Sequence, residues 1–269
     1  MSIRPNQPQT IGGVLDISFQ LYKASIGSVW PISLLLVFAS SPPTLYMIMK
    51  GSAIGDPSNP LGALAAMRSP GYWLAYVLSL VLTMWALGAL YIKMHAVGTG
   101  EELSLGDALR ASLGKALRLV LMSILFGFAV MFGLILLIVP GFILMVSLLL
   151  AWNLVLFEDK NAIAALTGSH HLVWGNWWRT ATILTVGGIV VIVAYFAVGM
   201  VVGLVLPLAG LGIQDAFLFS LVTGFLVGAV INLLFAPYYI SLLLSIYWDL
   251  KLRKEGGDLA ARVGALGTT

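Results

Sequence analysis

The fold is decided by SLGDALRASLGKALR at residues 104–118, LIVPGFIL at 137–144 and FEDKNAIAALTGSHHLVWGNWWRT at 157–180. From Leu119 to Phe157 the chain contains no Asp, Glu, Lys, Arg or His. A single helix over these residues would be roughly 58 Å long, whereas a bilayer core of roughly 30 Å needs only about 20 residues. Pro140 and Gly141, near the middle, therefore predict the turn of a transmembrane hairpin.

The composition places the chain in a membrane. Of its 269 residues, 60% are hydrophobic and 9% are charged, and the mean hydropathy is +1.01. A soluble domain of this length cannot bury so much apolar surface. The net charge of +3 is explained by basic residues that fix membrane topology, so nucleic acid is not an expected partner. The lack of cysteine excludes disulfides, thiolate metal sites and a cysteine nucleophile.

Six apolar spans are predicted, which makes the protein an all-α integral membrane protein. The first carries Pro42 and Pro43, which should kink or end its helix because proline donates no backbone hydrogen bond. The last would be roughly 50 Å long as one helix, so we expect a kink at Pro237 or a projection beyond the bilayer. The spans lie at about 28–49, 71–92, 119–139, 142–157, 180–206 and 216–248, with a Gly- and Pro-rich loop at 50–70 and a turn at 206–215.

Three amphipathic helices are predicted at the cytoplasmic interface, one before each pair of spans. The first covers residues 11–26, with apolar side chains at three- and four-residue spacings. The second begins at Ser104, with Asp107 three residues later, which is the pattern of a capping box. The third begins near Asp159 and ends at three tryptophans and an arginine, side chains suited to the headgroup layer.

This order of elements predicts a threefold repeat of a surface helix plus a transmembrane hairpin. A glycine marks each point where an amphipathic segment meets a span, at Gly27, Gly114 and Gly175. The repeats would divide a single membrane domain, residues 1–269, into units of about 11–95, 104–157 and 159–250, with a charged cytoplasmic tail at 249–269.

The basic residues orient the chain. Of its 14 lysines and arginines, all except Lys50 and Arg68 fall on one side of the predicted spans. Because basic loops stay in the cytoplasm, we expect both termini there.

Four motifs carry a family resemblance. They are LDISFQLYK at 15–23, LIVPGFIL at 137–144, LLLAWNLVLFEDKNAIAAL leading to GNWWR at 148–179, and IYWDLKLRKEG at 246–256. Spread over nearly the whole chain, they resemble the YciC-like inner-membrane proteins and the membrane domain that precedes the catalytic domain of some glycerophosphodiester phosphodiesterases. The resemblance implies a six-span bacterial inner-membrane protein. The catalytic carboxylates and histidines of the phosphodiesterases have no counterpart here, so their activity is not implied.

Glu158, Asp159, His170 and His171 are the densest group of candidate metal or acid–base residues. Neighbouring histidines on a helix point about 100° apart, whereas a two-histidine metal site needs a spacing of three or four. We therefore expect Asp159 to cap a helix and the histidines to face headgroups or water, with no catalytic residue, metal or cofactor. The span cores also lack the charges that a proton relay or an intramembrane protease would need.

Asn232 is the deepest strongly polar residue in the predicted spans. We expect it to make an interhelical hydrogen bond near Pro237, and the alternative is that it lines a permeation path. Two GxxxG spacings, Gly199 with Gly203 and Gly224 with Gly228, predict close packing within the bundle or, alternatively, a dimer face.

These features favour a multi-pass scaffold or lipid-associated accessory that is not an enzyme. The alternative is a transporter or export component for an apolar or amphipathic small molecule, since an uncharged interior tolerates such cargo. The expected partners are membrane lipids, and a homodimer or an unidentified membrane protein remains open. The side chains expected at lipid headgroups are Arg110, Lys115, Arg118, Trp177, Trp178 and Arg179.

Overall fold

A computed structural model of the chain describes residues 2–50, 61–208 and 216–266. The described residues form helices and no strand, which confirms the all-α fold. Much of the predicted first loop (51–60) and of the predicted turn near the last span (209–215) lies outside the described residues. The helices are α1 (Ile11–Ser40), α2 (Pro42–Met49), α4 (Gly62–Arg68), α5 (Pro70–Thr99), α6 (Leu105–Leu113), α7 (Ala116–Leu136), α8 (Ile138–Leu148), α9 (Ala151–Phe157), α10 (Ala162–Val173), α11 (Trp177–Leu208) and α12 (Ala216–Leu266).

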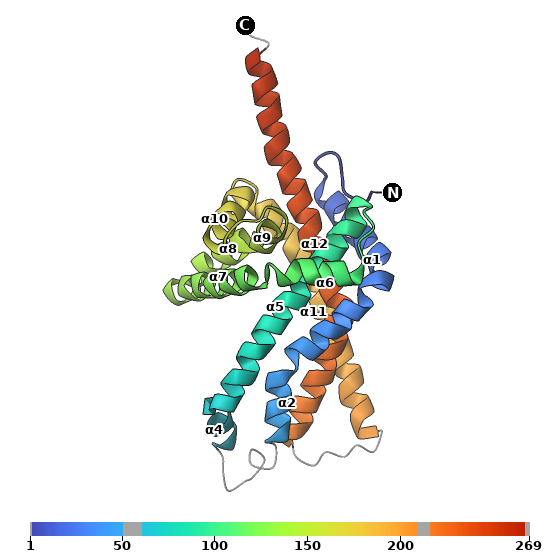
Figure 1. Cartoon of the computed structure of the whole chain (residues 1–269), viewed down its shortest axis with the longest axis vertical. Coiled ribbons are helices and arrows are strands. Elements are labelled where there is room, and N and C mark those ends of the chain that lie inside the picture. The colour runs from blue at the N-terminus through green and yellow to red at the C-terminus, as the bar shows by residue number, and fades with distance from the viewer. Residues whose placement is uncertain (1, 51–60, 209–215, 267–269) are drawn as a thin grey trace.

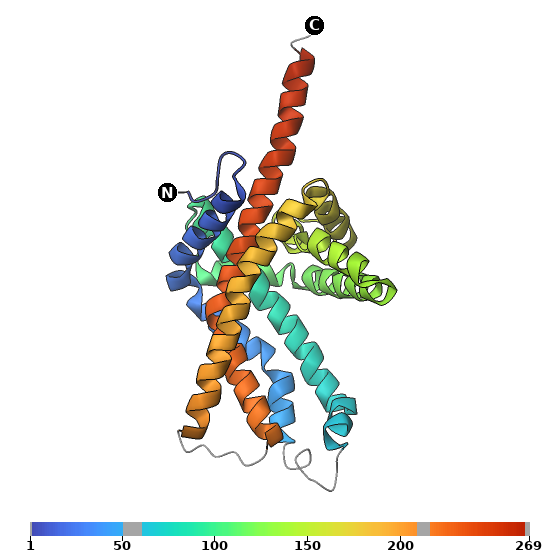
Figure 2. The same ribbon diagram turned by 180° about the vertical axis from the view of Figure 1, so that it is seen from behind.

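Six helical segments of the described chain are long and apolar enough to cross a membrane: α1, α5, α7, α8 continued by α9, α11 and α12. This finding confirms a multi-pass membrane protein. Four of the six, α1, α5, α11 and α12, run together along the long axis of the molecule (Figures 1 and 2). They form the bundle, in which α1 packs on α5 and α12, and α11 packs on α12.

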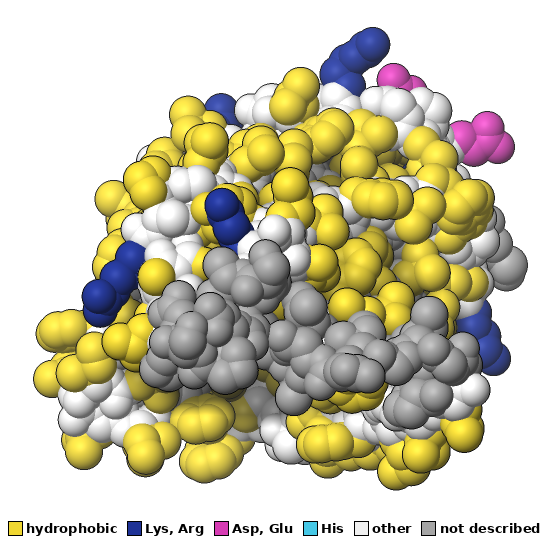
Figure 3. All heavy atoms as spheres, turned by 90° about the horizontal axis from the view of Figure 1, so that it is seen from below, with side chains coloured by type: hydrophobic (Ala, Val, Ile, Leu, Met, Phe, Trp, Pro, Cys, Tyr) yellow, Lys and Arg dark blue, Asp and Glu magenta, His cyan; other side chains and the backbone are white. Residues whose placement is uncertain are grey.

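The two ends of the bundle differ in charge. We call the end where α1 and α11 begin the basic end, because ion pairs there involve Lys115, Arg118, Lys160, Arg179, Lys251 and Arg253. The helices α2 and α4 lie at the opposite end (Figure 1). Seen from that opposite end, the surface is mostly hydrophobic with scattered charges (Figure 3).

The first predicted interfacial helix is not a separate element. Helix α1 runs without a break from Ile11 to Ser40, and Val14, Leu21 and Ser25 in its first half are buried. Gly27, predicted as the junction, lies inside the helix in open surroundings and does not end it. The break occurs instead at Ser41 before Pro42, as the paired prolines predicted.

Helix α12 is continuous through Pro237 and extends far beyond the other helices at the basic end (Figure 1). Its projection beyond the bilayer stays a prediction. The residues predicted as a charged tail begin inside this helix, and Asp249, the first of them, is buried. The threefold repeat and its boundaries stay predictions.

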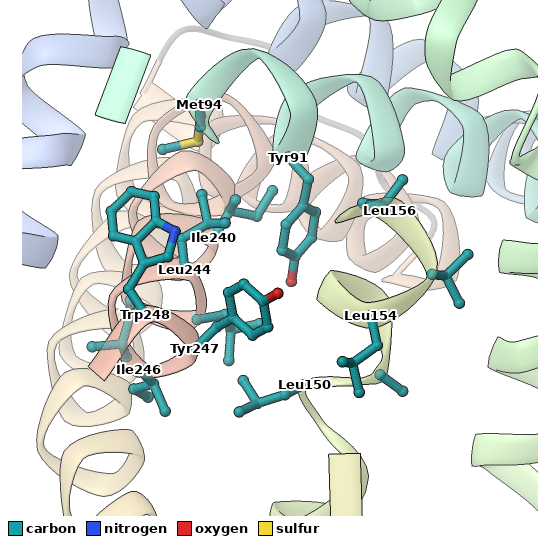
Figure 4. Close-up of a cluster of buried hydrophobic side chains, with 14 of the residues drawn as sticks. Tyr91, Met94, Leu150, Leu154, Leu156, Ile240, Leu244, Ile246, Tyr247 and Trp248 are labelled. Atoms are coloured by element: carbon teal, nitrogen blue, oxygen red, sulfur yellow. The ribbon is translucent and has the colours of Figure 1, made fainter. Parts of the chain in front are cut away.

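The largest buried cluster lies where α1, α5, α9 and α12 meet, near the basic end. Figure 4 shows Met94 of α5, Leu154 of α9 and Trp248 of α12 in this cluster. A Cβ on Gly98 of α5 would come within 2.3 Å of the Trp248 ring. The indole can pack against α5 only because residue 98 has no side chain. This packing joins α9 to the bundle helices α5 and α12.

Helices α7 and α8 form the predicted hairpin, but the chain turns at Leu137, whose backbone is extended. Pro140 lies in the first turn of α8, where its missing N–H would have no intrahelical partner in any case. Gly141 serves the packing: a Cβ there would lie 2.8 Å from the backbone nitrogen of Leu134, and one on Gly133 would lie 2.9 Å from the Cα of Gly141. The two glycines let the helices approach closely. The hairpin lies across the long axis, not beside the bundle helices (Figure 1).

Candidate functional site

The start of α7 is tied to the turn between α9 and α10. Lys115 Nζ lies 3.0 Å from a carboxylate oxygen of Asp159 and donates to the carbonyl of Leu156 at 2.6 Å, and Arg118 lies 3.5 Å from the same carboxylate. The hydrogen bond and charge of Lys115 hold the pKa of Asp159 below its usual range. The prediction that Asp159 caps the third helix is wrong. Asn161 caps α10 instead, because Asp159 adopts a positive φ of 49° two residues earlier and turns to the cations.

A second cluster surrounds Asp249, whose side chain is 2% exposed. Its carboxylate accepts hydrogen bonds from Arg179, Arg253 and the backbone N–H of Gln9, at 2.8 to 3.2 Å. The carbonyl of Gln9 accepts from both guanidinium groups. Two cations therefore share one anion, so the cluster carries one excess positive charge. It joins the N-terminal segment, α11 and α12.

A third cluster lies at Glu158, at the end of α9. Lys251 and Lys160 lie 2.7 and 2.9 Å from its two carboxylate oxygens, and the Tyr247 hydroxyl donates to it at 2.9 Å. Burial alone would raise the pKa of Glu158, but these hydrogen bonds outweigh burial and lower it. Glu158 is thus a stably ionised structural anion at this end of the molecule.

Beside the Asp249 cluster, an open groove of about 640 Å³ separates the turn of the α7–α8 hairpin from the start of α11. Its walls are mostly apolar, and two of its lining residues are joined by a hydrogen bond from Trp177 Nε1 to the carbonyl of Ile143 at 3.3 Å. Gly175 makes the bend that leads into α11, with a φ of +93° that favours glycine. The lining residues are Val139, Ile143, Trp174, Gly175, Asn176, Trp177, Trp178 and Arg179.

The structure separates the six residues predicted to meet lipid headgroups into three groups. Trp177, Trp178 and Arg179 line the groove together. The cation in the groove is Arg179, which belongs to the Asp249 cluster with its excess positive charge. Lys115 and Arg118 lie in the Asp159 cluster instead. The remaining residue, Arg110, is exposed on α6. Their predicted contact with headgroups stays a prediction.

Ser104 caps the second predicted surface helix, as expected, but among the described residues the Asp107 carboxylate accepts from the Ser104 hydroxyl and not from a backbone N–H, so only half of the predicted capping box is formed. The Ser104 hydroxyl accepts from the backbone N–H of Asp107 at 3.0 Å and donates to the Asp107 carboxylate at 2.6 Å. Helix α6 packs on α5, where the Trp85 indole N–H donates to the carbonyl of Leu109 and the Ser112 hydroxyl donates to the carbonyl of Trp85. The helix is thereby fixed to the bundle.

The other candidate residues are dispersed. His170 and His171 line a mostly apolar groove of about 480 Å³ between α10 and the hairpin. Within residues 2–50, 61–208 and 216–266, no three His, Asp or Glu side chains are grouped so that they could hold a metal ion.

Asn232 does not make the expected interhelical bond to any described residue. It lines a notch of mixed polar and apolar character, of about 250 Å³, between α1, α2 and α12, together with Gly224 and Gly228. A Cβ on either glycine, or on Gly199 or Gly203, would meet no atom within 4 Å, so the close packing predicted inside the bundle is wrong for the described residues.

Neither Asp249 nor Asn153 is singled out from the sequence, although both are buried. Asp249 had a signal: a single acidic residue follows a long apolar run, and Arg179 begins another. No signal in the sequence marks Asn153, because its neighbours along the chain are apolar, as in any predicted span. Both amide atoms of Asn153 are buried, and neither has a hydrogen-bond partner among the described residues.

Comparison with known proteins places this arrangement in a family. A family model described as a domain of unknown function, DUF7847, matches residues 63–242, about two thirds of the chain. The match runs from α4 into α12 and includes the hairpin and the groove. No curated protein and no solved structure matches the chain. The chain belongs to the DUF7847 family, a domain of unknown function.

Proposed function

We propose that this protein is a non-enzymatic membrane scaffold or lipid-associated accessory whose groove at the basic end holds an anionic phospholipid. The observation that carries the proposal is the groove itself, where apolar walls and indoles end at Arg179. An acyl chain fits the apolar part because it exchanges apolar contacts with the bilayer for contacts of the same kind. A phosphate fits the Arg179 end because the Asp249 cluster has one cation in excess.

The tryptophans support the same occupant. Indoles gather at the headgroup level of membranes, where the ring meets acyl chains and the N–H meets water or phosphate. Trp178 is 80% exposed and Trp174 is 56% exposed, so both rings are available to a lipid. Anionic headgroups are favoured over zwitterionic ones, since a cation near an anionic surface contributes about 1 kcal/mol.

The location belongs to the same proposal. The excess of basic residues at one end of the bundle supports a bacterial inner membrane with this end and both termini in the cytoplasm. The resemblance to YciC-like proteins supports the same placement. Membrane lipids are the proposed partners, and a homodimer or a second membrane protein would add to them.

Filling the groove tests the proposal. Val139→Trp places a large ring among the lining residues, and Ile135→Trp adds the same ring at an exposed position of α7 outside the groove. We expect Val139→Trp to retain at least fivefold less phosphatidylglycerol after purification, measured by native mass spectrometry. Ile135→Trp should retain as much as the wild type. Equal retention by both variants would refute the lipid site.

The alternative function is a transporter for an apolar or amphipathic molecule, and the notch at Asn232 favours it. Polar side chains such as Thr44 and Asn232 share the lining of that notch with apolar ones, and the notch lies toward the opposite end of the bundle. A transport path would have to continue toward the basic end, where Leu90, Met94 and Trp248 are almost fully buried in the main cluster. This filled core supports the scaffold over the transporter.

A further inference from the structure

The turn of the α7–α8 hairpin lies at the basic end of the bundle. Trp177 is the first residue of α11, and its indole donates to the carbonyl of Ile143, six residues after the turn at Leu137. Val139, still closer to the turn, lines the groove with Trp178. A hairpin that crossed the membrane beside α11 would instead bring its turn to the far end of that helix, near Leu208.

The base of the hairpin lies at the same end. Lys115, just before α7, pairs with Asp159 and donates to the carbonyl of Leu156 at the end of α9. Both the base and the turn of the hairpin are therefore attached to the basic end. Helix α7 has 21 residues, about 32 Å at about 1.5 Å per residue, which is long enough to cross a bilayer. Its direction, and not its length, keeps it at one end, as Figures 1 and 2 show.

The hairpin nevertheless needs an apolar solvent. Its outer surface carries a continuous set of exposed apolar side chains far larger than soluble proteins leave in water. The set consists of Leu117, Leu121, Ile124, Leu125, Phe128, Met131, Phe132, Leu134, Ile135, Leu136, Leu137, Ile138, Val139 and Phe142. Helix α11, which contacts the hairpin, also exposes apolar side chains such as Val186 and Ile189, so the acyl chains that cover α11 are the occupant that continues over the hairpin.

The backbone satisfies the demands of such a location. Both arms are helical, and the N–H of Leu137 at the turn donates to the carbonyl of Gly133 at 3.0 Å. Helical arms leave few backbone groups unpaired, which is the condition for an element that lies within hydrocarbon. The close approach at Gly133 and Gly141 keeps the arms together without a partner helix.

We infer that the α7–α8 hairpin is a re-entrant element that lies among the acyl chains of the leaflet at the basic end and does not cross the bilayer. The chain then crosses four times, through α1, α5, α11 and α12. The even number keeps both termini on one side, so tests of terminus sidedness cannot detect the difference. A hairpin in one leaflet enlarges that leaflet alone, which suits an element that responds to lipid packing. The inference is independent of the proposed lipid in the groove.

Distances within the protein test the inference. The chain has no native cysteine, so spin labels can be placed in pairs at Ile138, Thr182 and Met200, all exposed. Thr182 and Met200 lie on one face of α11, about 27 Å apart at about 1.5 Å per residue. Pulsed EPR on the full chain in lipid nanodiscs should give a clearly shorter distance from Ile138 to Thr182 than from Ile138 to Met200.

The pair Thr182–Met200 is the internal control, because its distance is fixed within one helix and reports that each labelled protein is folded. A hairpin that crosses the bilayer reverses the order of the two Ile138 distances. Any resolved population in which Ile138 is as near to Met200 as to Thr182, or nearer, overturns the inference.

Discussion

Asp249 joins three segments at the basic end: the N-terminal segment, α11 and α12. Its buried carboxylate binds Arg179 of α11, Arg253 of α12 and the backbone of Gln9. Removing its charge leaves two partly buried guanidinium groups facing each other without an anion. The loss of one member from a buried ion pair is strongly destabilising.

We expect Asp249→Asn to lower the free energy of unfolding in detergent by about 3 kcal/mol. Asp16→Asn is the matched control, because Asp16 is exposed on α1 and its change should stay within about 0.5 kcal/mol. Denaturation of both variants against the wild type measures the difference. If Asp249→Asn lowers the free energy of unfolding no more than Asp16→Asn does, the Asp249 cluster does not stabilise the contacts between the N-terminal segment, α11 and α12.

The ends of several helices could be predicted from the sequence, because local chemistry sets them. Ser104 and Asp107 begin α6, and Pro42 ends α1, as expected. The continuity of α1 was missed because its polar residues suggested a surface helix, whereas tertiary packing on α12 buries Ser18 and Ser25. The sequence predicts a helix cap at Asp159 because it does not show that Lys115 lies beside this residue in space.

The hairpin depends on two glycines at its crossing. Gly133→Ala would place a Cβ 2.9 Å from the Cα of Gly141, which is backbone and can move only if the arms separate. We expect a loss of about 1–3 kcal/mol in the free energy of unfolding, as in other overpacked sites. Gly127→Ala on the same helix meets nothing within 4 Å, so it should be neutral or gain up to about 1 kcal/mol from helix propensity. Equal effects of the two variants in detergent denaturation would exclude a tight crossing.

For the whole molecule, hydropathy predicted how many apolar segments exist but not how they are directed. The stretch from Leu119 to Phe157 reads equally well as two crossings or as a hairpin in one leaflet, since both need helical, uncharged arms. The hydrogen bond between Trp177 and Ile143 favours the hairpin in one leaflet over two crossings. The sequence does not show this contact, because the two residues are far apart in the chain. The groove could be predicted only in part for the same reason: the GNWWR motif supplies one wall, and the hairpin turn supplies the other.

The groove and the hairpin lead to one arrangement, in which the basic end of the protein is embedded in a single leaflet and holds a phospholipid there. Electron cryomicroscopy of the full chain in nanodiscs of phosphatidylglycerol, with a bound antibody fragment to add mass, tests this arrangement most directly. We expect the α7–α8 hairpin at the depth of Trp177, and lipid density in the groove with its headgroup beside Arg179. A hairpin that reaches the other leaflet beside α11, with no lipid between Val139 and Trp178, would contradict it.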